Sequence, residues 1–217
     1  MFDLDRKQTC ITGANMNRRI TRFHSTFHFL AHFCFLLIAT SFSSNANSAG
    51  MIMIDFTQPD EYQQWQATND NVMGGISQGQ ITFDGQSSRF YGELSLANNG
   101  GFSSISRPVA PLPVSVEQVA IEFVGDGRAY QLRLATWKNG TRITYKHEFS
   151  TTLGLRQRKI LDLHNFQAVF RGQLITGAPA LAANDIRQVG LLIADKMAGP
   201  FELNLVQVQF IPTSQRQ

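Results

Sequence analysis

The stretch Asn69-Asp70-Asn71-Val72-Met73-Gly74-Gly75-Ile76-Ser77 is echoed further along the chain by Asn98-Asn99-Gly100-Gly101-Phe102-Ser103-Ser104. In each stretch a Gly-Gly pair follows Asn or Asp and precedes a strand-like run. Glycine reaches positive φ without steric cost, and Asn and Asp are the next most tolerant residues. The two pairs therefore predict two loops of unusual backbone geometry in one β-rich domain. They serve either as plain turns or, together, as a polar binding surface.

Alternating apolar and polar residues predict strands along most of the chain after Met51. The predicted strands cover residues 52–56, 89–96, 119–123, 130–134, 142–149, 189–193 and 201–210. Asn139-Gly140 predicts a two-residue hairpin turn. In the last run the apolar positions move from Phe201, Leu203 and Leu205 to Val206, Val208 and Phe210, which predicts a β-bulge. Only residues 59–66 and 180–184 suggest short helices, so the pattern predicts an all-β, antiparallel β-sandwich of the jelly-roll kind.

The segment before residue 50 has a different character. Three arginines after Met16 are followed by the apolar run 27–39 and by a segment, residues 41–49, rich in small polar residues. This layout predicts a secretory signal within a leader at residues 1–49, cut after Ala46 or Ala49, and hence an exported, periplasmic domain. Two alternatives stay open. One is translation that starts at Met16 or near Met51, the latter giving a cytoplasmic protein. The other is an uncleaved leader acting as a membrane anchor.

The domain at residues 51–217 carries no net charge. Five of the 19 lysines and arginines and two of the 16 acids precede residue 50, which leaves 14 of each in the domain. A neutral domain argues against nucleic acid as a partner. Both cysteines, Cys10 and Cys34, lie in the leader, and the domain has only His147 and His164. No disulfide, metal site or cofactor is therefore expected in it.

Taken in order, the motifs of the domain resemble one family. The pieces are Asp55-Phe56, Trp65, NDNVMGGIS (69–77), Phe90-Tyr91-Gly92, SLANNGGFSSI (95–105), GDGRAYQLRL (125–134), Tyr145, Phe149, residues 165–166 and 170–172, and IRQVGLLIADKMAGPFELNL (186–205). They resemble the NADH:ubiquinone oxidoreductase (complex I) intermediate-associated protein family. The resemblance implies a galactose-binding-like β-sandwich and a non-catalytic, chaperone-like role in assembling respiratory complex I.

Seven polar residues are candidates for a binding surface on the loops. They are Asn69, Asp70, Asn98, Asn99, Asp126, Arg128 and Arg171. Amide side chains offer donors and acceptors to a peptide or a sugar, and Arg171 is suited to clamp an acidic group. Asp126-Gly127-Arg128 predicts a hairpin turn in which Arg128 is solvated; the alternative is an ion pair of Asp126 and Arg128 across the turn or toward Asp70.

The remaining motif residues are expected to be structural. They are Trp65, Met73, Gly74, Gly75, Gly100, Gly101, Phe102, Gly199 and Pro200. The large aromatics Trp65, Phe102, Trp137 and Phe201 are expected in the core, and Trp137 is the best candidate for sugar stacking if it lies on a rim instead.

Three functions follow in order of preference. The first is a protein-binding assembly factor whose partners are respiratory-complex subunits. The second is a carbohydrate-binding module of the bacterial envelope. The third is a hydrolase that uses Asp70 and Asp126 as paired carboxylates.

Overall fold

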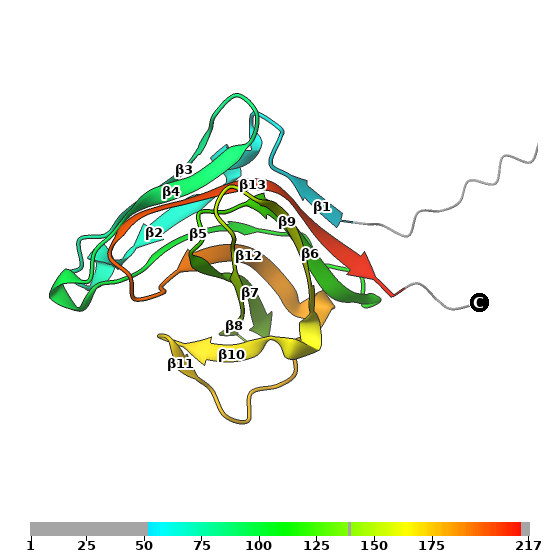
Figure 1. Cartoon of the computed structure of the whole chain (residues 1–217). Helices are drawn as coiled ribbons and strands as arrows, with labels where there is room; N and C mark the ends of the chain where they lie inside the picture. Colours follow the sequence, from blue (N-terminus) through cyan, green and yellow to red (C-terminus); the bar gives the residue numbers. More distant parts are fainter. Residues whose placement is uncertain (1–51, 139, 214–217) are drawn as a thin grey trace, which may run out of the picture. The chain divides into compact units, whose positions relative to one another are not determined.

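The computed structural model describes residues 52–138 and 140–213, which form two antiparallel sheets that face each other (Figure 1). The predicted leader lies outside the described residues. One sheet has the strand order β3-β4-β13-β6-β9, with β1 also paired to β13, and the other has the order β11-β10-β8-β7-β12-β5-β2. The predicted all-β sandwich is confirmed.

The strands of the first sheet are β1 (Ile52–Asp55), β3 (Gln78–Phe83), β4 (Ser88–Leu94), β6 (Val116–Val124), β9 (Arg156–Asp162) and β13 (Gly199–Pro212). Those of the second are β2 (Gln66–Asn69), β5 (Ser103–Pro108), β7 (Ala129–Lys138), β8 (Thr141–Ser150), β10 (Gln167–Phe170), β11 (Gln173–Leu174) and β12 (Ile186–Ile193). The helical turns among the described residues are short 3₁₀ segments: η1 (Glu61–Gln64), η2 (Asp70–Met73), η3 (Ala97–Asn99), η4 (Leu163–Asn165) and η5 (Ala183–Asp185).

Aromatic side chains fill the space between the sheets. Phe123 of β6 packs against Phe149 of β8 with ring centroids 5.1 Å apart, so this contact joins the two sheets. Phe90 and Phe201 meet at 5.0 Å on the neighbouring strands β4 and β13. Trp65 is buried and its Nε1 donates to Glu61 over 2.9 Å, which confirms its place in the core.

Two local predictions from the sequence are confirmed. The pairing of β13 with β6 shifts register between Leu205 and Gln207, where the apolar face changes sides. Strands β7 and β8 pair up to Lys138 opposite Thr141, as a two-residue hairpin requires, and Gly140 has a φ of 76°. Asn139 itself lies outside the described residues.

The predicted short helices are present only as single 3₁₀ turns: η1 lies within residues 59–66, and η5 overlaps the end of residues 180–184. Strands β2, β3, β5, β9, β10 and β11 extend the sandwich beyond the predicted runs. None of the described helical segments is long and apolar enough to span a membrane.

Candidate binding groove and the Gly-Gly loops

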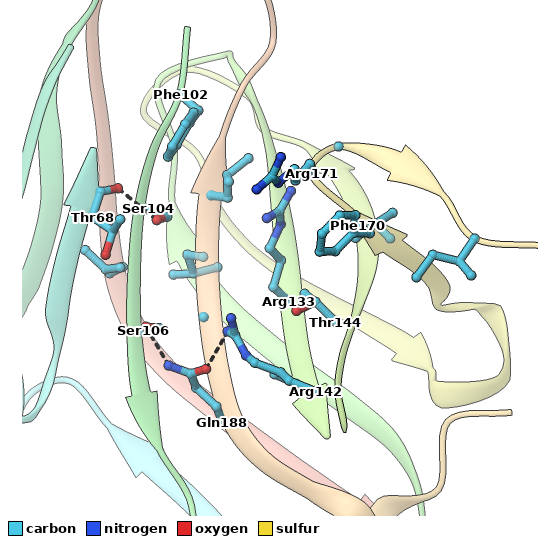
Figure 2. A pocket seen from close by; sticks show the side chains of 18 residues that line it. Thr68, Phe102, Ser104, Ser106, Arg133, Arg142, Thr144, Phe170, Arg171 and Gln188 are labelled. Atoms are coloured by element: carbon cyan, nitrogen blue, oxygen red, sulfur yellow. Dashed lines mark hydrogen bonds between the residues drawn. The ribbon is translucent and has the colours of Figure 1, made fainter. Parts of the chain in front are cut away.

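A groove of about 430 Å³ lies on the outward face of the seven-stranded sheet (Figure 2). Alternation along the strands produces this face, because successive side chains of a strand point to opposite sides. In β7, for example, Leu132 and Leu134 face the core, whereas Arg133 and Ala135 line the groove. The lining extends from Thr68 of β2 to Phe170 at the end of β10.

The groove is cationic. Its lining includes Arg133 of β7, Arg142 of β8 and Arg171 of the β10–β11 turn, but no Asp or Glu. Arg142 Nη2 donates to Gln188 Oε1 over 2.7 Å, and Gln188 Nε2 donates to Ser106 Oγ over 2.9 Å. Figure 2 shows this chain of hydrogen bonds from Arg142 through Gln188 to Ser106. The short side chain of Ala135, which pairs with Gln188 in the neighbouring strand, also lines the groove.

Arg133 is held in place at the centre of the groove. Its Nε and Nη2 both donate to Gln131 Oε1, at 3.1 and 2.9 Å. Burial, together with the positive charge of Arg142, lowers the pKa of Arg133, and the carboxylate of Glu148 partly opposes this shift. Glu148 lies outside the groove lining and accepts hydrogen bonds from Lys146 and Gln131. The groove therefore holds positive charge that its own lining does not neutralise.

Two aromatic residues lie elsewhere than predicted. Trp137 was expected in the core but is 44% exposed, with the guanidinium carbon of Arg142 5.1 Å from its ring centroid. Near the end of β7 it follows Thr136, which is buried, and shares the outward face of the sheet with Arg133 and Ala135, so alternation along the strand turns its ring away from the core. Phe102 is half-buried and lines the groove instead of filling the core. Phe201 is buried, as predicted.

The two Gly-Gly loops do come together, and a single buried carboxylate joins them. Asp70 has no exposed surface. Its side chain accepts hydrogen bonds from Ser77 N (2.8 Å), Ser77 Oγ (2.5 Å), Gly101 N (2.6 Å) and Phe102 N (3.3 Å). Burial by itself would raise the pKa of Asp70, but the hydrogen bonds from Ser77, Gly101 and Phe102 outweigh it and lower the pKa. Asp70 is thus a structural anion and not a surface ligand.

The carboxylate also explains why glycine occupies these positions. A Cβ on Gly75 would lie 2.3 Å from Asp70 Cγ, and one on Gly100 would lie 2.5 Å from Asp70 Oδ2. Gly74 and Gly101 have φ values of 91° and 123°, as unusual turns require. Positive φ therefore accounts for one glycine of each pair, and lack of space beside Asp70 accounts for the other.

The three candidate asparagines play different roles. Asn69 is half-buried: its Nδ2 donates to Gly79 O over 3.2 Å and its Oδ1 accepts from Ser103 Oγ over 2.7 Å. Asn98 and Asn99 are exposed and have φ values of 57° and 58°. Within the part of the chain that the structure describes, their side chains make no hydrogen bond, so they do not cap their turn. Their amides remain available to a ligand.

Arg128 is a structural residue rather than part of a binding surface. It is buried and its guanidinium forms a fork with Asp195, Nε to Oδ2 at 2.9 Å and Nη2 to Oδ1 at 2.7 Å. It also donates to the carbonyl oxygens of Met197, Gly199 and Pro200. The expected solvated arginine is therefore wrong, and the alternative ion pair to Asp126 or Asp70 is also absent, since the guanidinium pairs with Asp195.

Asp126 also has internal partners. It accepts from Arg128 N (2.9 Å), Tyr130 Oη (2.9 Å) and Glu202 N (2.8 Å). Asp70 and Asp126 share no hydrogen-bond partner, and the lowered pKa of Asp70 is the opposite of what a general acid requires. The described residues also contain no cluster of His, Cys, Asp or Glu suited to a metal ion.

Of the seven predicted binding residues, Arg171 lines the groove, whereas Arg133, Arg142 and Gln188 were not among the candidates. The sequence did contain one indication that Arg133 and Arg142 share a face, namely the hairpin turn. Once Asn139-Gly140 is taken as a hairpin turn, Arg133 falls opposite Lys146 and on the same face as Arg142. The sequence does not show that the β10–β11 turn brings Arg171 to the same face.

The two facing sheets have the β-sandwich fold that is also found in carbohydrate-binding modules. The family 11 carbohydrate-binding module of a cellulosomal cellulase from Clostridium thermocellum is similar, with a TM-score of 0.56, 11% identity, 77% of this chain covered and 98% of that one. The module of that family from Clostridium thermocellum in complex with a beta-1,3-1,4-mixed-linked tetrasaccharide has a TM-score of 0.54, 11% identity and coverages of 73% and 95%. At this identity the likeness concerns the fold alone.

A family model identifies the chain more closely. The model of complex I intermediate-associated protein 30 matches residues 54–205, and the chain belongs to that family. No curated protein matches the chain.

Proposed function

We propose that this domain is a non-catalytic, protein-binding assembly factor for respiratory complex I. Membership of the complex I intermediate-associated protein 30 family supports this role. The structural observation that carries the proposal is a concentration of exposed apolar side chains at one end of the sandwich.

Five loops lie at that end. Register places them together, because Ile193 pairs with both Ser103 and Tyr130, Tyr130 pairs with Phe149, and Gly199 pairs with Leu94. The loops after β2 and β4 and the turn before β13 lie close together at the left of Figure 1. We call this the loop end; it comprises residues 70–77, 95–102, 125–128, 151–155 and 194–198.

The loop end exposes seven large apolar side chains. They are Val72, Met73, Ile76, Leu96, Leu153, Leu155 and Met197, each between 45% and 77% exposed. Its acids, Asp70, Asp126 and Asp195, are engaged in internal hydrogen bonds. An apolar, weakly charged surface gathered at one place is typical of a site for a partner protein.

Site-specific photo-crosslinking tests this proposal. A photoreactive phenylalanine analogue replaces Met73 or Leu153 in the full chain at native expression level, and Met53, which is 50% exposed on β1, serves as the control. We expect adducts with respiratory-complex subunits from the two loop-end positions and not from position 53. Equal labelling from all three positions, or no complex I subunit among the adducts, would contradict the proposal.

The same capture reports the compartment. We infer that an assembly factor acting inside the cell begins near Met51, so its N-terminal peptide should begin there. An N-terminus between Ala46 and Gly50, together with envelope proteins among the adducts, would overturn the assembly role.

Carbohydrate binding is the second candidate, and one observation favours it. The groove combines hydroxyl and amide side chains, among them Ser104, Ser106 and Gln188, with the exposed ring of Trp137 on the same face. Affinity electrophoresis in gels containing mixed-linked glucan tests this candidate, with Trp137→Ala as the variant. Retardation of the parent chain that the variant loses would support carbohydrate binding.

A further inference from the structure

We propose that the cationic groove binds an acidic, extended segment of a partner protein, with Arg133, Arg142 and Arg171 receiving its carboxylates. The proposal rests on the proposed protein-binding function, but it concerns a different surface from the loop end, which it meets at Phe102.

Charge is the first reason. Three guanidinium groups from three separate elements line a groove that has no acid in its lining. Arg171 is exposed, and among the described residues it has no hydrogen-bond or ion-pair partner. Arg142 commits one nitrogen to Gln188, and Arg133 commits two to Gln131, which leaves donors on both. Guanidinium groups favour carboxylate ligands because their planar fork matches both oxygens.

The position of the arginines is the second reason. Burial and the charge of Arg142 lower the pKa of Arg133, against the opposing carboxylate of Glu148, so the guanidinium of Arg133 is partly desolvated beside a second cation. In Figure 2 the side chains of Arg133, from β7, and Arg171, from the β10–β11 turn, both reach into the groove. A carboxylate bound beside Arg133 would compensate the repulsion between Arg133 and Arg142, so a negative ligand gains more here than at an isolated surface arginine.

The aromatic rings of this face argue against a neutral sugar. Sugar rings are held by stacking on an open aromatic face. The guanidinium of Arg171 lies 5.4 Å from the centroid of Phe170, and that of Arg142 lies 5.1 Å from the centroid of Trp137. One face of each ring is thus covered by a cation. A ligand entering from that side meets a guanidinium group first.

The shape of the floor suits an extended chain. Gly190 lies in the middle of β12, between Arg133 of β7 and Ser106 of β5, and its missing side chain leaves the floor flat. From β10 to β2 the groove crosses five strand spacings, about 24 Å at the usual spacing of neighbouring strands. This length accommodates roughly seven residues of extended peptide. The acids would lie over β7, β8 and the β10–β11 turn, and the hydroxyls of Thr68, Ser104 and Ser106 would face the polar remainder.

Fluorescence anisotropy with synthetic peptides tests the proposal. The probes are a labelled ten-residue peptide of alternating Glu and Ser, the same peptide with Gln in place of Glu, and one with Lys in place of Glu. The folded full chain is titrated at low and at high salt. We expect the Glu peptide alone to bind, and its affinity to fall several-fold with salt, because the contacts are ionic and partly exposed.

Two variants and a matched control locate the site. Arg171→Glu and Arg142→Gln should each weaken binding of the Glu peptide, Arg171→Glu by about tenfold or more. Arg158→Gln removes an exposed arginine from β9 of the opposite sheet and should leave binding unchanged. Melting temperatures of all variants establish that each is folded.

Several results would overturn the proposal. They are absence of binding, equal binding by the Gln or Lys peptide, and unchanged binding in Arg171→Glu. Tighter binding of polygalacturonate than of the Glu peptide would assign the groove to an acidic polysaccharide instead. Failure here is separable from failure of the assembly role, because the crosslinks at Met73 and Leu153 do not involve the groove. If the Glu peptide binds but those crosslinks are absent, the groove proposal is supported and complex I is contradicted as the partner.

Discussion

Asp70 accepts hydrogen bonds from Ser77, Gly101 and Phe102 while its carboxylate is completely buried. Around it, Gly75 and Gly100 leave the space that the carboxylate occupies. The two Gly-Gly motifs therefore form loops that are joined by one buried carboxylate, that of Asp70. The sequence predicted the special backbone, but nothing in it showed that one residue of the first motif is enclosed by the second.

Asp70→Asn should destabilise the domain by about 2–3 kcal/mol. The amide keeps one acceptor but turns two N–H donors toward the backbone N–H groups that the carboxylate had satisfied, so buried donors lose their partners. Urea unfolding measures the change. Asp60→Asn, at an exposed acid, is the control and should stay within about 0.5 kcal/mol. An equally small change in Asp70→Asn would show that the buried carboxylate does not contribute to the stability of the domain.

The lowered pKa of Asp70 also predicts a pH dependence. Between its folded pKa and the ordinary value near 3.9, the unfolded state binds more protons than the folded state, so stability rises with pH across that window and is lost as the pH falls through it. The parent chain should therefore lose more free energy of unfolding between pH 5 and pH 3 than Asp70→Asn does. The other acids with lowered pKa are present in both chains, so they cancel in the difference. Equal losses would refute the assignment.

The two tryptophans allow the same substitution to be compared at a buried site and at an exposed site. Trp65 is buried against Phe56, with ring centroids 5.2 Å apart, whereas Trp137 is 44% exposed. Trp65→Ala should cost about 3–5 kcal/mol, since it leaves a cavity, and Trp137→Ala about 1 kcal/mol or less. Chemical denaturation of both variants decides the matter. A large loss at Trp137 would mean that the end of the β7–β8 hairpin packs more tightly than its exposure suggests.

At the scale of elements, the long strands were predictable because each has one core face and one solvent face. The register shift in β13 was visible as a change of apolar face at Val206. The short strands β2, β10 and β11 were not predictable from the sequence, since a strand of two to four residues is too short to show an alternating pattern of apolar and polar residues. Pairing with a neighbouring strand defines them: β2 lies on β5, and β10 lies on β8.

The turn between β12 and β13 depends on Arg128. Its side chain, 8% exposed, pairs with Asp195 and donates to the carbonyl oxygen of Met197 in that turn and to those of Gly199 and Pro200 at the start of β13. Arg128→Ala should destabilise by about 3–5 kcal/mol, because it leaves Asp195 buried and unpaired. Arg156→Ala removes an arginine that pairs with Glu122 while 63% exposed, and should cost less than about 1 kcal/mol. Thermal melts of the two variants make the comparison, and equal losses would contradict the structural role of Arg128.

At the scale of the whole molecule, the class of fold and the family followed from ordered motifs, and the binding surfaces did not. A groove is a property of the sheet's shape and of which strands are neighbours. Arg142 and Gln188 are far apart in the chain, and they meet only because β12 lies beside β7. The loop end was equally hidden, since its apolar residues look like core residues when each is read in its own segment.

The sheet pairing of β1 carries a last prediction about the domain as a unit. Ile54 and Phe56 are buried, Phe56 N donates to Val206 O over 3.0 Å, and β1 pairs with β13 from Ile52 to Asp55. A chain of residues 51–217 should therefore unfold in one cooperative transition. A chain that begins at Thr57 loses both apolar side chains from the core and should be less stable by roughly 3–6 kcal/mol. Urea unfolding followed by tryptophan fluorescence compares the two chains. If the shorter chain keeps the midpoint of the longer one, β1 is an accessory strand and the domain is complete without it.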